Sequence, residues 1–487
     1  MRNRDTNFRS VFINGLRWSA LKRFGQAFLS ITVIIIMARL LNPSDFGLVA
    51  MATVFTGISN VFTELGTGDA LIRKKNPTND FISSIFWLNT SLAFLVCLVL
   101  AAIASSVADL YGQDIIEILI YVLSIEILLS GINRVSHALL EKNMRFKAIA
   151  FAQITSQICG ASIGITMAFL GYGLWSLVFL GISSQLIYTI IVNLALRWRP
   201  SVTFNFNHIK SIFSFSSYLT LVKILDHIQR RSEIFIVAYL MGSHLGGVYS
   251  QSHSLLRKPV KLISGFMAPV LFSTMSSLLE NIERVKSLYL KSIQSFAMIY
   301  IPISVVLILY SEPFVLFILG EKWFEMAEIM PVFGFMLLFA SMHKCNTIAL
   351  KSVGRVDLLF RMYVVFVIAS IVGCIIGAQF GIFWVAVSML ITTFLLFIAS
   401  TIISTQVLKI KFVIYFEQIS TLITYGLLMF ISGYLLNLLL SSFFESSHIL
   451  LGIFGFLICS IVYILALLMR PVPAWHHFKE LLNIRKL

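Results

Sequence analysis

Long apolar runs separated by short polar turns dominate the pattern of this chain. A helix that crosses a bilayer needs about 20 mostly apolar residues, and fourteen segments have this character. They centre on residues 18–40, 47–66, 83–107, 115–139, 148–170, 174–196, 213–241, 246–270, 287–310, 326–349, 357–378, 382–405, 416–440 and 448–469. Turn signals such as Asn42-Pro43-Ser44 and Gly242-Ser243 close most of them. The pattern therefore predicts an all-α integral membrane protein with about 14 transmembrane helices.

The composition agrees with this fold class. Of the 487 residues, 58% are hydrophobic and 12% are charged, whereas soluble domains are about 45–50% apolar and about 25% charged. A chain this apolar cannot cover itself with a polar surface, which excludes a soluble enzyme, a DNA-binding protein and a disordered chain. The net charge of +15 is interpreted as basic cytoplasmic loops, not as a nucleic-acid surface.

Connections rich in lysine and arginine alternate with connections that have almost none. The tails and the even-numbered connections carry them, as at Lys74-Lys75, Arg197 and Arg199, while Lys322 is the one basic residue in the odd-numbered connections. Because cytoplasmic loops are enriched in basic residues, we expect both termini to lie in the cytoplasm.

The chain also resembles itself at an offset of 200 residues. Ile34–Leu40 matches Ile234–Leu240, and the turns that follow end at Gly47 and Gly247. Such repeats place transport sites at the interface between the halves, near the midplane.

A later pair continues the repeat, since Leu140 with Arg145 recurs as Leu350 with Arg355. We therefore expect two pseudo-symmetric six-helix lobes around a central cavity, plus two extra C-terminal helices. The predicted divisions are residues 1–205, 206–411 and 412–487.

Charged residues at membrane depth are costly and usually functional, and the seventh predicted helix carries a group of them. Lys223, Asp226, Arg230 and Glu233 share one face at spacings of 3, 4 and 3 residues, and Arg231 flanks them. Two interpretations stay open. The charges pair with one another, or Lys223, Arg230 and Arg231 bind a phosphate or an acidic sugar, with Asp226 and Glu233 as cavity-lining or coupling residues.

The eighth predicted helix repeats this arrangement. Ser250, Ser254, Arg257 and Lys261 share a face, with Lys258 nearby, and Pro259 should kink the helix. Arg257, Lys258 and Lys261 are predicted to bind substrate, and the two serines to line the cavity. The alternative is that the helix ends early and these cations lie on a loop.

Milder candidates occur in the first half. Gln26 and Asn60 are predicted to line the cavity, and Arg39 near the outer end of the first helix is predicted to have a gating or structural role.

Catalytic and cofactor motifs are missing from the sequence. There is no GxxxxGK[ST] motif and no metal-ligand cluster, and the five cysteines form no CxxC pair. We expect no enzyme activity, metal or cofactor, and leave a proton gradient, a sodium gradient and the membrane potential open as energy sources.

Several short motifs resemble those of one transporter family. They are Arg17-Trp18-Ser19-Ala20, Ala38-Arg39-Leu40-Leu41, Asp45-Phe46-Gly47-Leu48-Val49-Ala50-Met51, Arg145-Phe146-Lys147-Ala148, Arg197-Trp198-Arg199-Pro200 and Leu319-Gly320-Glu321-Lys322-Trp323. On these motifs the chain resembles Wzx-type polysaccharide flippases of the multidrug/oligosaccharidyl-lipid/polysaccharide (MOP) superfamily. The branch is the colanic-acid and teichuronic-acid exporter-like group.

The resemblance implies alternating-access transport of undecaprenyl-diphosphate-linked oligosaccharide from the inner to the outer leaflet of a bacterial cytoplasmic membrane. The pathway would be surface polysaccharide biosynthesis, such as that of lipopolysaccharide or exopolysaccharide. The implied partners are membrane lipids and a polymerase and glycosyltransferases of the same pathway.

Two other functions stay open. One is a cation-coupled drug or small-solute antiporter of the same superfamily, although basic residues would repel a cationic drug. The other is an integral-membrane polysaccharide polymerase or ligase, which would need a catalytic outer loop. The longest predicted outer loop is 311–325.

Overall fold

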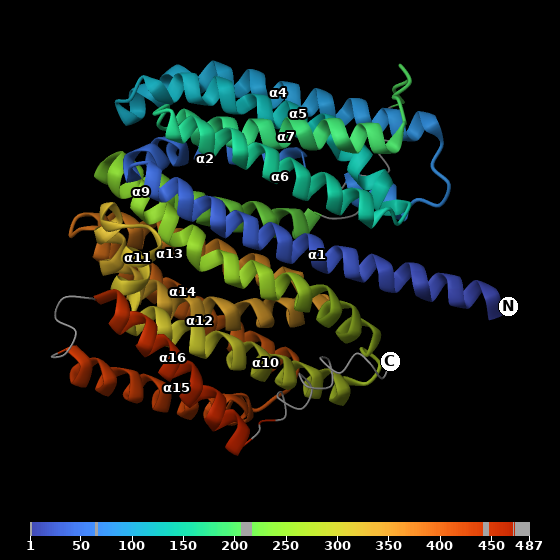
Figure 1. Ribbon diagram of the computed structural model, residues 1–487. Helices are drawn as coiled ribbons and strands as arrows, with labels where there is room; N and C mark the ends of the chain where they lie inside the picture. Colours follow the sequence, from blue (N-terminus) through green and yellow to red (C-terminus); the bar gives the residue numbers. More distant parts are fainter. Residues whose placement is uncertain (1, 64–66, 206–216, 442–447, 471, 473–487) are drawn as a thin grey trace. The chain divides into compact units, whose positions relative to one another are not determined.

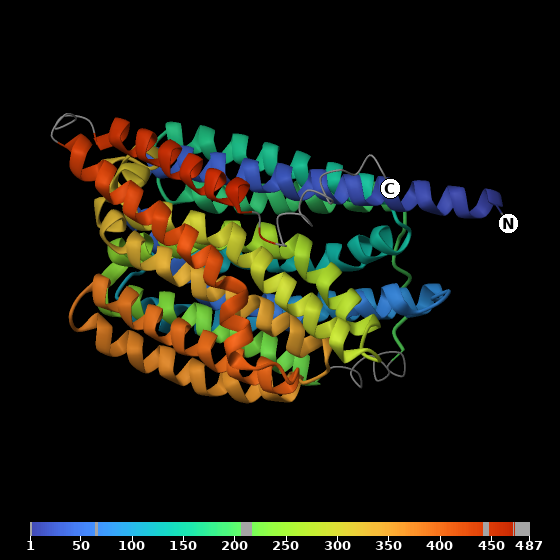
Figure 2. The ribbon, with the colours of Figure 1, turned by 90° about the horizontal axis from the view of Figure 1, so that it is seen from below.

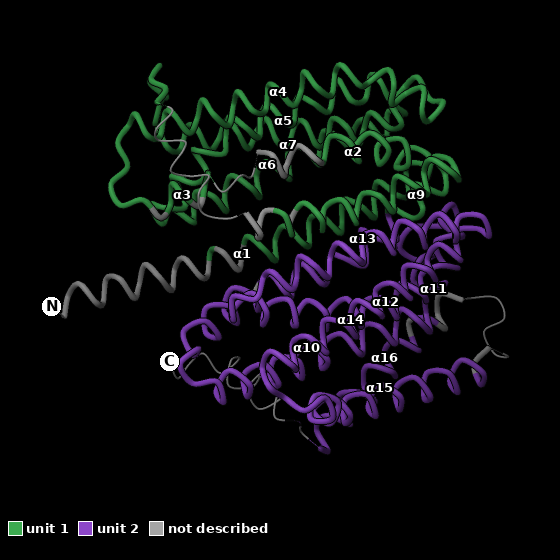
Figure 3. Tube along the Cα trace, turned by 180° about the vertical axis from the view of Figure 1, so that it is seen from behind, with its two compact units in different colours: residues 1–250 green, residues 251–487 purple. Residues whose placement is uncertain are grey.

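The computed structural model describes residues 2–63, 67–205, 217–441, 448–470 and 472. Contacts within this part of the chain divide it into two compact units, residues 1–250 and 251–487 (Figure 3). These units differ from the lobes 1–205, 206–411 and 412–487, which stay a prediction.

Unit 1 is a group of packed helices that run along a common direction (Figure 1). Helix α6 packs on α7 and α1, and α5 packs on α4, α7 and α2. The helices are α1 (Arg2–Leu40), α2 (Pro43–Thr63), α3 (Thr67–Arg73), α4 (Asn79–Tyr111), α5 (Ile115–Lys142), α6 (Phe146–Phe169), α7 (Trp175–Leu196) and the first part of α9 (Ser217–Ser277).

Unit 2 begins within α9 and is also built from helices (Figure 2). Helix α12 packs on α10 and α14, and α15 packs on α10 and α16. The elements are α10 (Ile282–Leu309), α11 (Ser311–Ile318), the 3₁₀ helix η1 (Glu321–Trp323), α12 (Phe324–Ser352), α13 (Val356–Ala378), α14 (Ile382–Val407), α15 (Phe412–Ser441) and α16 (His448–Met469).

The all-α membrane fold is confirmed, and each of the fourteen predicted segments overlaps a helix. By length and composition, ten helices of the described residues qualify as membrane spans, or eleven when one bent pair is included. The count of about 14 is therefore not confirmed. The predicted outer loop 311–325 instead holds the short helices α11 and η1.

Helix α9 contains a reversal of the chain at Gly242. This glycine has φ 84° and ψ 176°, a left-handed conformation that glycine adopts without a side-chain penalty. The hydroxyl of Tyr249 donates to Oε2 of Glu233 over 3.3 Å, although sixteen residues of straight helix would separate them by about 24 Å. Within unit 1 the chain therefore reverses direction at Gly242, as the turn predicted at Gly242-Ser243 requires.

The two turns of the repeat contact each other reciprocally within unit 1. A Cβ atom on Gly47 would overlap the carbonyl oxygen of Ser243, and a Cβ atom on Gly247 would overlap that of Pro43. At the offset of 200 residues, Pro43 corresponds to Ser243 and Gly47 to Gly247. The contact thus has the reciprocity of a two-fold symmetric interface, and it depends on both glycines.

A second part of the repeat has the same backbone in both copies. Arg145 precedes α6 with φ −84° and ψ 48°, and Arg355 precedes α13 with φ −86° and ψ 53°. The amide of Arg145 donates to Leu140 and that of Arg355 to Leu350, each over 2.9 Å. The sequence repeat is therefore a structural repeat at these two junctions.

Basic residues gather at one end of unit 1. Nζ of Lys142 donates to the carbonyl oxygen of Leu71 over 3.0 Å, and Nη1 of Arg145 donates to that of Ala195 over 2.8 Å. The ends of α3, α5 and α7 therefore lie together, as the predicted alternation of basic connections requires.

Substituting the contact glycines should loosen unit 1. We expect Gly47→Ala and Gly247→Ala each to cost about 1–3 kcal/mol, because the new methyl group meets backbone that cannot rotate away. The melting temperature of the purified protein in detergent should fall by several degrees. Gly25→Ala is the control, because its nearest neighbour would be a side-chain atom of Ile154 at 3.4 Å. Equal melting temperatures for Gly47→Ala, Gly247→Ala and Gly25→Ala would contradict the close backbone contact between the two turns.

Candidate substrate site

Arg231 connects the first part of α9 to α2. Its Nη1 lies 3.5 Å from Oγ1 of Thr53, and a Cβ atom on Gly57 would lie 2.9 Å from its Nη2. Because Gly57 has no side chain, the guanidinium of Arg231 can lie directly on the surface of α2.

This contact lies near the middle of both helices, which are predicted to span the membrane. Arg231 precedes the reversal at Gly242 by eleven residues, or about 16 Å of helix. Half of a hydrocarbon core is about 15 Å. Thr53 lies midway along α2. A permanent cation at this depth is costly and needs a partner, a water-filled path or an anionic ligand.

The neighbouring acidic residues on α9 have partners within the same unit. Asp226 forms an ion pair with Arg230 one turn away, with about a third of each side chain exposed. Nε of Arg230 also donates to the carbonyl oxygen of Asp226 over 2.9 Å. Glu233 is buried, with 6% of its surface exposed, and accepts from Tyr249. The mutual pairing considered for this stripe is therefore present for Arg230 and Asp226.

An aromatic cluster follows Arg231 along α9 toward Gly242. Phe235 and Tyr239 follow it at i+4 and i+8 on α9 and stack with centroids 5.9 Å apart. Phe55 of α2 and Tyr111 of α4 complete the cluster, with edge contacts to Phe235 at 6.0 Å and 5.7 Å. The side chain of Tyr239 is 47% exposed. The sequence pattern did not predict this cluster, although the helical spacing of Phe235 and Tyr239 from Arg231 is a usable signal.

The second part of α9 holds the remaining cations in unit 2. The helix runs through Pro259 to Ser277, so Arg257 and Lys261 lie on a helix and not on a loop. A bend of 41° lies between Gly265 and Met267. Pro269 explains this bend, because a proline ring clashes with the carbonyl group four residues earlier, here that of Gly265.

The side chains around these cations differ in exposure. Lys261 is exposed, whereas Ser250, Ser254, Arg257 and Lys258 are half-buried.

The remaining predicted site residues differ in exposure, and the side chains of two of them are not described by the structure. Gln26 is half-buried, and its carbonyl oxygen accepts from Gln157 over 3.4 Å. Arg39 is exposed in the last turn of α1. The side chains of Lys223 and Asn60 lie outside the described residues. Among the residues that are described, no group of three or more His, Cys, Asp or Glu side chains could hold a metal ion.

The sequence matches the family described as "Polysaccharide biosynthesis protein" over residues 36–328. More than half of the chain is matched, so the protein belongs to this family. The membership agrees with the resemblance to Wzx-type flippases.

Several relatives are similar over most of their length. The succinoglycan biosynthesis transport protein ExoT of Rhizobium meliloti (strain 1021) is 27% identical, over 75% of this chain and 74% of the relative. The lipopolysaccharide biosynthesis protein WzxC of Escherichia coli (strain K12) is 21% identical, over 77% and 76%. The teichuronic acid biosynthesis protein TuaB of Bacillus subtilis (strain 168) is 21% identical, over 72% of each chain.

Solved structures share the fold. The lipid II flippase MurJ in an inward closed conformation superimposes with a TM-score of 0.70 at 17% identity, over 93% of this chain and 97% of that chain. An inward-facing multidrug resistance MATE family transporter of the MOP superfamily superimposes with a TM-score of 0.62 at 13% identity, over 80% and 98%. The chain therefore has the fold of MOP-superfamily transporters.

The ion pair on α9 should contribute to stability. We expect Arg230→Ala to lower the melting temperature and the amount of folded protein, because Asp226 loses its cation. The cost should be about 1–3 kcal/mol, below the about 3–5 kcal/mol of a fully buried pair, since both side chains are partly exposed. The double variant Arg230→Ala/Asp226→Ala should recover most of the loss. A stable Arg230→Ala variant with no benefit from the second change would show that the pair has no structural role.

Proposed function

We propose that the protein is a flippase that moves an undecaprenyl-diphosphate-linked oligosaccharide from the inner to the outer leaflet of a bacterial cytoplasmic membrane by alternating access. The observation that carries the proposal is the contact of the Arg231 cation with the middle of α2, one helical turn from an aromatic cluster. The family membership and the flippase fold support the same function.

The proposed substrate has three parts that need different surroundings in the protein. Its diphosphate is anionic, its sugars are polar and its polyprenyl tail is apolar. The diphosphate needs cationic donors along its path, and a guanidinium offers several N–H groups in one plane for phosphate oxygens. Arg231 offers such a group in unit 1, and Arg257, Lys258 and Lys261 are proposed as further phosphate ligands in unit 2.

The aromatic cluster suits the sugar part of the substrate. A sugar ring has an apolar face that packs on an aromatic ring and hydroxyl groups that need polar partners. Phe235 and Tyr239 supply aromatic faces next to the cation, and tyrosine also carries a hydroxyl group. A site that combines a phosphate ligand with aromatic surfaces matches a lipid-linked sugar better than a lone phosphate.

The alternative functions have weaker support. A cationic drug would meet Arg231 at the centre of its path and be repelled. A polymerase or ligase needs catalytic groups, and the relatives named above include a transport protein. We therefore propose a transporter without enzyme activity.

Orientation and energy coupling are part of the proposal. Basic residues at one end of unit 1 support cytoplasmic termini by the positive-inside rule. A proton gradient, a sodium gradient or the membrane potential would drive transport. The polymerase and glycosyltransferases of the same pathway would be its functional partners.

Removing the charge of Arg231 should stop transport without unfolding the protein. We expect Arg231→Ala to reduce surface polysaccharide about 10–100-fold in a strain that lacks its own exporter, since a charged hydrogen bond is worth about 1.5–3 kcal/mol. Arg231→Lys should keep partial activity because it keeps the charge.

The matched control is Arg230→Ala/Asp226→Ala, which removes the neighbouring cation together with its partner and should keep transport. Membrane abundance and melting temperature are measured for every variant. Normal polysaccharide export by a stable Arg231→Ala variant would refute the role of this cation.

A further inference from the structure

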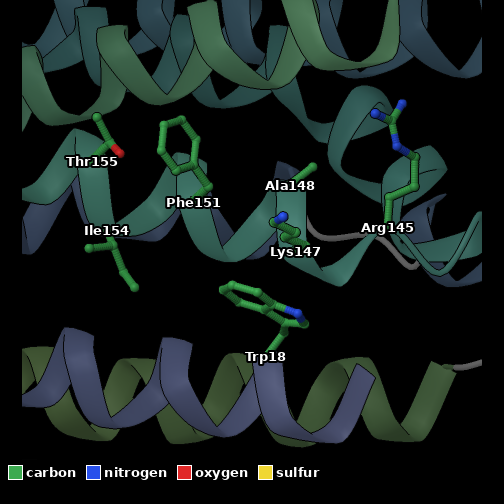
Figure 4. Close-up of a pocket in the computed structure, with 7 residues that line it drawn as sticks. All are labelled: Trp18, Arg145, Lys147, Ala148, Phe151, Ile154 and Thr155. Carbon is green, nitrogen blue, oxygen red and sulfur yellow. The ribbon is translucent and has the colours of Figure 1, made fainter. Parts of the chain in front are cut away.

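A cavity of about 620 Å³ lies between α1 and α6 in unit 1 (Figure 4). It is lined by Trp18, Arg145, Lys147, Ala148, Phe151, Ile154 and Thr155. The indole of Trp18 points from α1 toward α6 in Figure 4. The two cations belong to the α5–α6 junction, at the end of the unit where basic residues gather. The other lining side chains are mostly apolar and follow along the helices.

The basic end of this cavity has two exposed cations close in sequence. Nζ of Lys147 lies over the ring of Trp18, 5.6 Å from its centroid. Arg145 donates from Nη1 to the carbonyl oxygen of Ala195 over 2.8 Å. Neither cation forms an ion pair with an acidic side chain among the residues that the structure describes.

The repeat shows that the second of these cations, Lys147, is not required by the backbone. Arg355 occupies the equivalent position in unit 2 with nearly the same backbone angles. Two residues later the second copy has Asp357, where the first copy has Lys147. Nε of Arg355 lies 3.2 Å from Oδ1 of Asp357, and this ion pair raises the pKa of the Arg355 guanidinium.

At these two positions the charges therefore cancel in one copy, and both are positive in the other. The fold accepts either a positive charge, as at Lys147, or a negative one, as at Asp357. The positive charge of Lys147 is therefore available to bind an anion from outside the protein. The apolar side chains beside these cations favour an anion that carries a hydrocarbon chain. Tryptophan at this level is typical of the boundary between head groups and hydrocarbon, and basic pockets between membrane helices bind anionic lipid head groups.

We infer that the cavity between α1 and α6 binds an anionic phospholipid of the bilayer. Its phosphate lies between Arg145 and Lys147, and an acyl chain lies along Trp18, Phe151 and Ile154. A bulk phospholipid is the occupant that the geometry favours, because every such molecule holds its phosphate at the level of the head groups, where these cations are exposed. The lipid is a bound partner of the fold and not the transported substrate.

The test uses the full-length protein in detergent and native mass spectrometry. Phosphatidylglycerol, cardiolipin and phosphatidylcholine are titrated separately, and retained lipid is measured. We expect saturable retention of phosphatidylglycerol or cardiolipin and little of phosphatidylcholine. Arg145→Gln/Lys147→Gln should weaken anionic-lipid binding about thirtyfold, from about fivefold for each cation near the membrane surface.

The matched control is Arg197→Gln/Arg199→Gln, which removes two exposed cations at the same spacing from a nearby connection. It should bind anionic lipid like the parent protein. Lys147→Asp should weaken binding at least as much as the double glutamine variant, because it reproduces the charge arrangement of Arg355 and Asp357. Melting temperature without lipid shows which variants are folded.

Three outcomes would overturn the inference. The first is equal loss in the Arg197→Gln/Arg199→Gln control, which would indicate a diffuse charge effect. The second is unchanged retention in a folded Arg145→Gln/Lys147→Gln variant. The third is displacement of phosphatidylglycerol from this cavity by equimolar undecaprenyl phosphate, which would assign the cavity to the substrate path.

Discussion

The cost of moving charge out of water is the constraint on which the rest of this structure depends. Within a bilayer the backbone must satisfy its own hydrogen bonds, so the described chain is helical. Any charged side chain at membrane depth then needs a partner or a polar path. Asp226 and Arg230 meet this demand through each other, and Glu233 through the hydroxyl of Tyr249. Arg231 contacts α2 through Thr53 and the space left by Gly57.

The two copies of the internal repeat share their backbone at equivalent junctions but differ in the charged side chains that they carry there. Gly47 and Gly247 allow the two equivalent turns to approach until their backbones touch. Arg145 and Arg355 begin equivalent helices with the same hydrogen bond. On this shared backbone, Asp357 neutralises one junction whereas Lys147 adds a second positive charge to the other. Single substitutions between the copies can therefore change what each position binds without changing how the chain folds.

Much of the fold could be predicted from the sequence, because apolar length and the turn at Gly242 are local signals. Pairing along one helix, as for Asp226 and Arg230, also follows from spacing. The contact of Arg231 with Thr53 could not be predicted, since the two residues are 178 positions apart and only packing brings them close. The contact of Phe55 and Tyr111 with Phe235 is equally non-local. The bend in α9 was expected at Pro259, but the one that the structure gives follows Gly265, because sequence alone does not show which proline the neighbouring helices allow to bend.

The most direct test of the account is transport by the purified protein. Proteoliposomes would contain an undecaprenyl-diphosphate-linked oligosaccharide with a fluorescent sugar, and a membrane-impermeant quencher would report its leaflet over time under an imposed ion gradient. The account predicts that the parent protein moves the diphosphate-linked substrate, and that Arg231→Ala, reconstituted to the same level, moves it no faster than protein-free vesicles. Equal rates for the parent protein and Arg231→Ala would contradict the claim that this cation carries the lipid-linked diphosphate across the membrane.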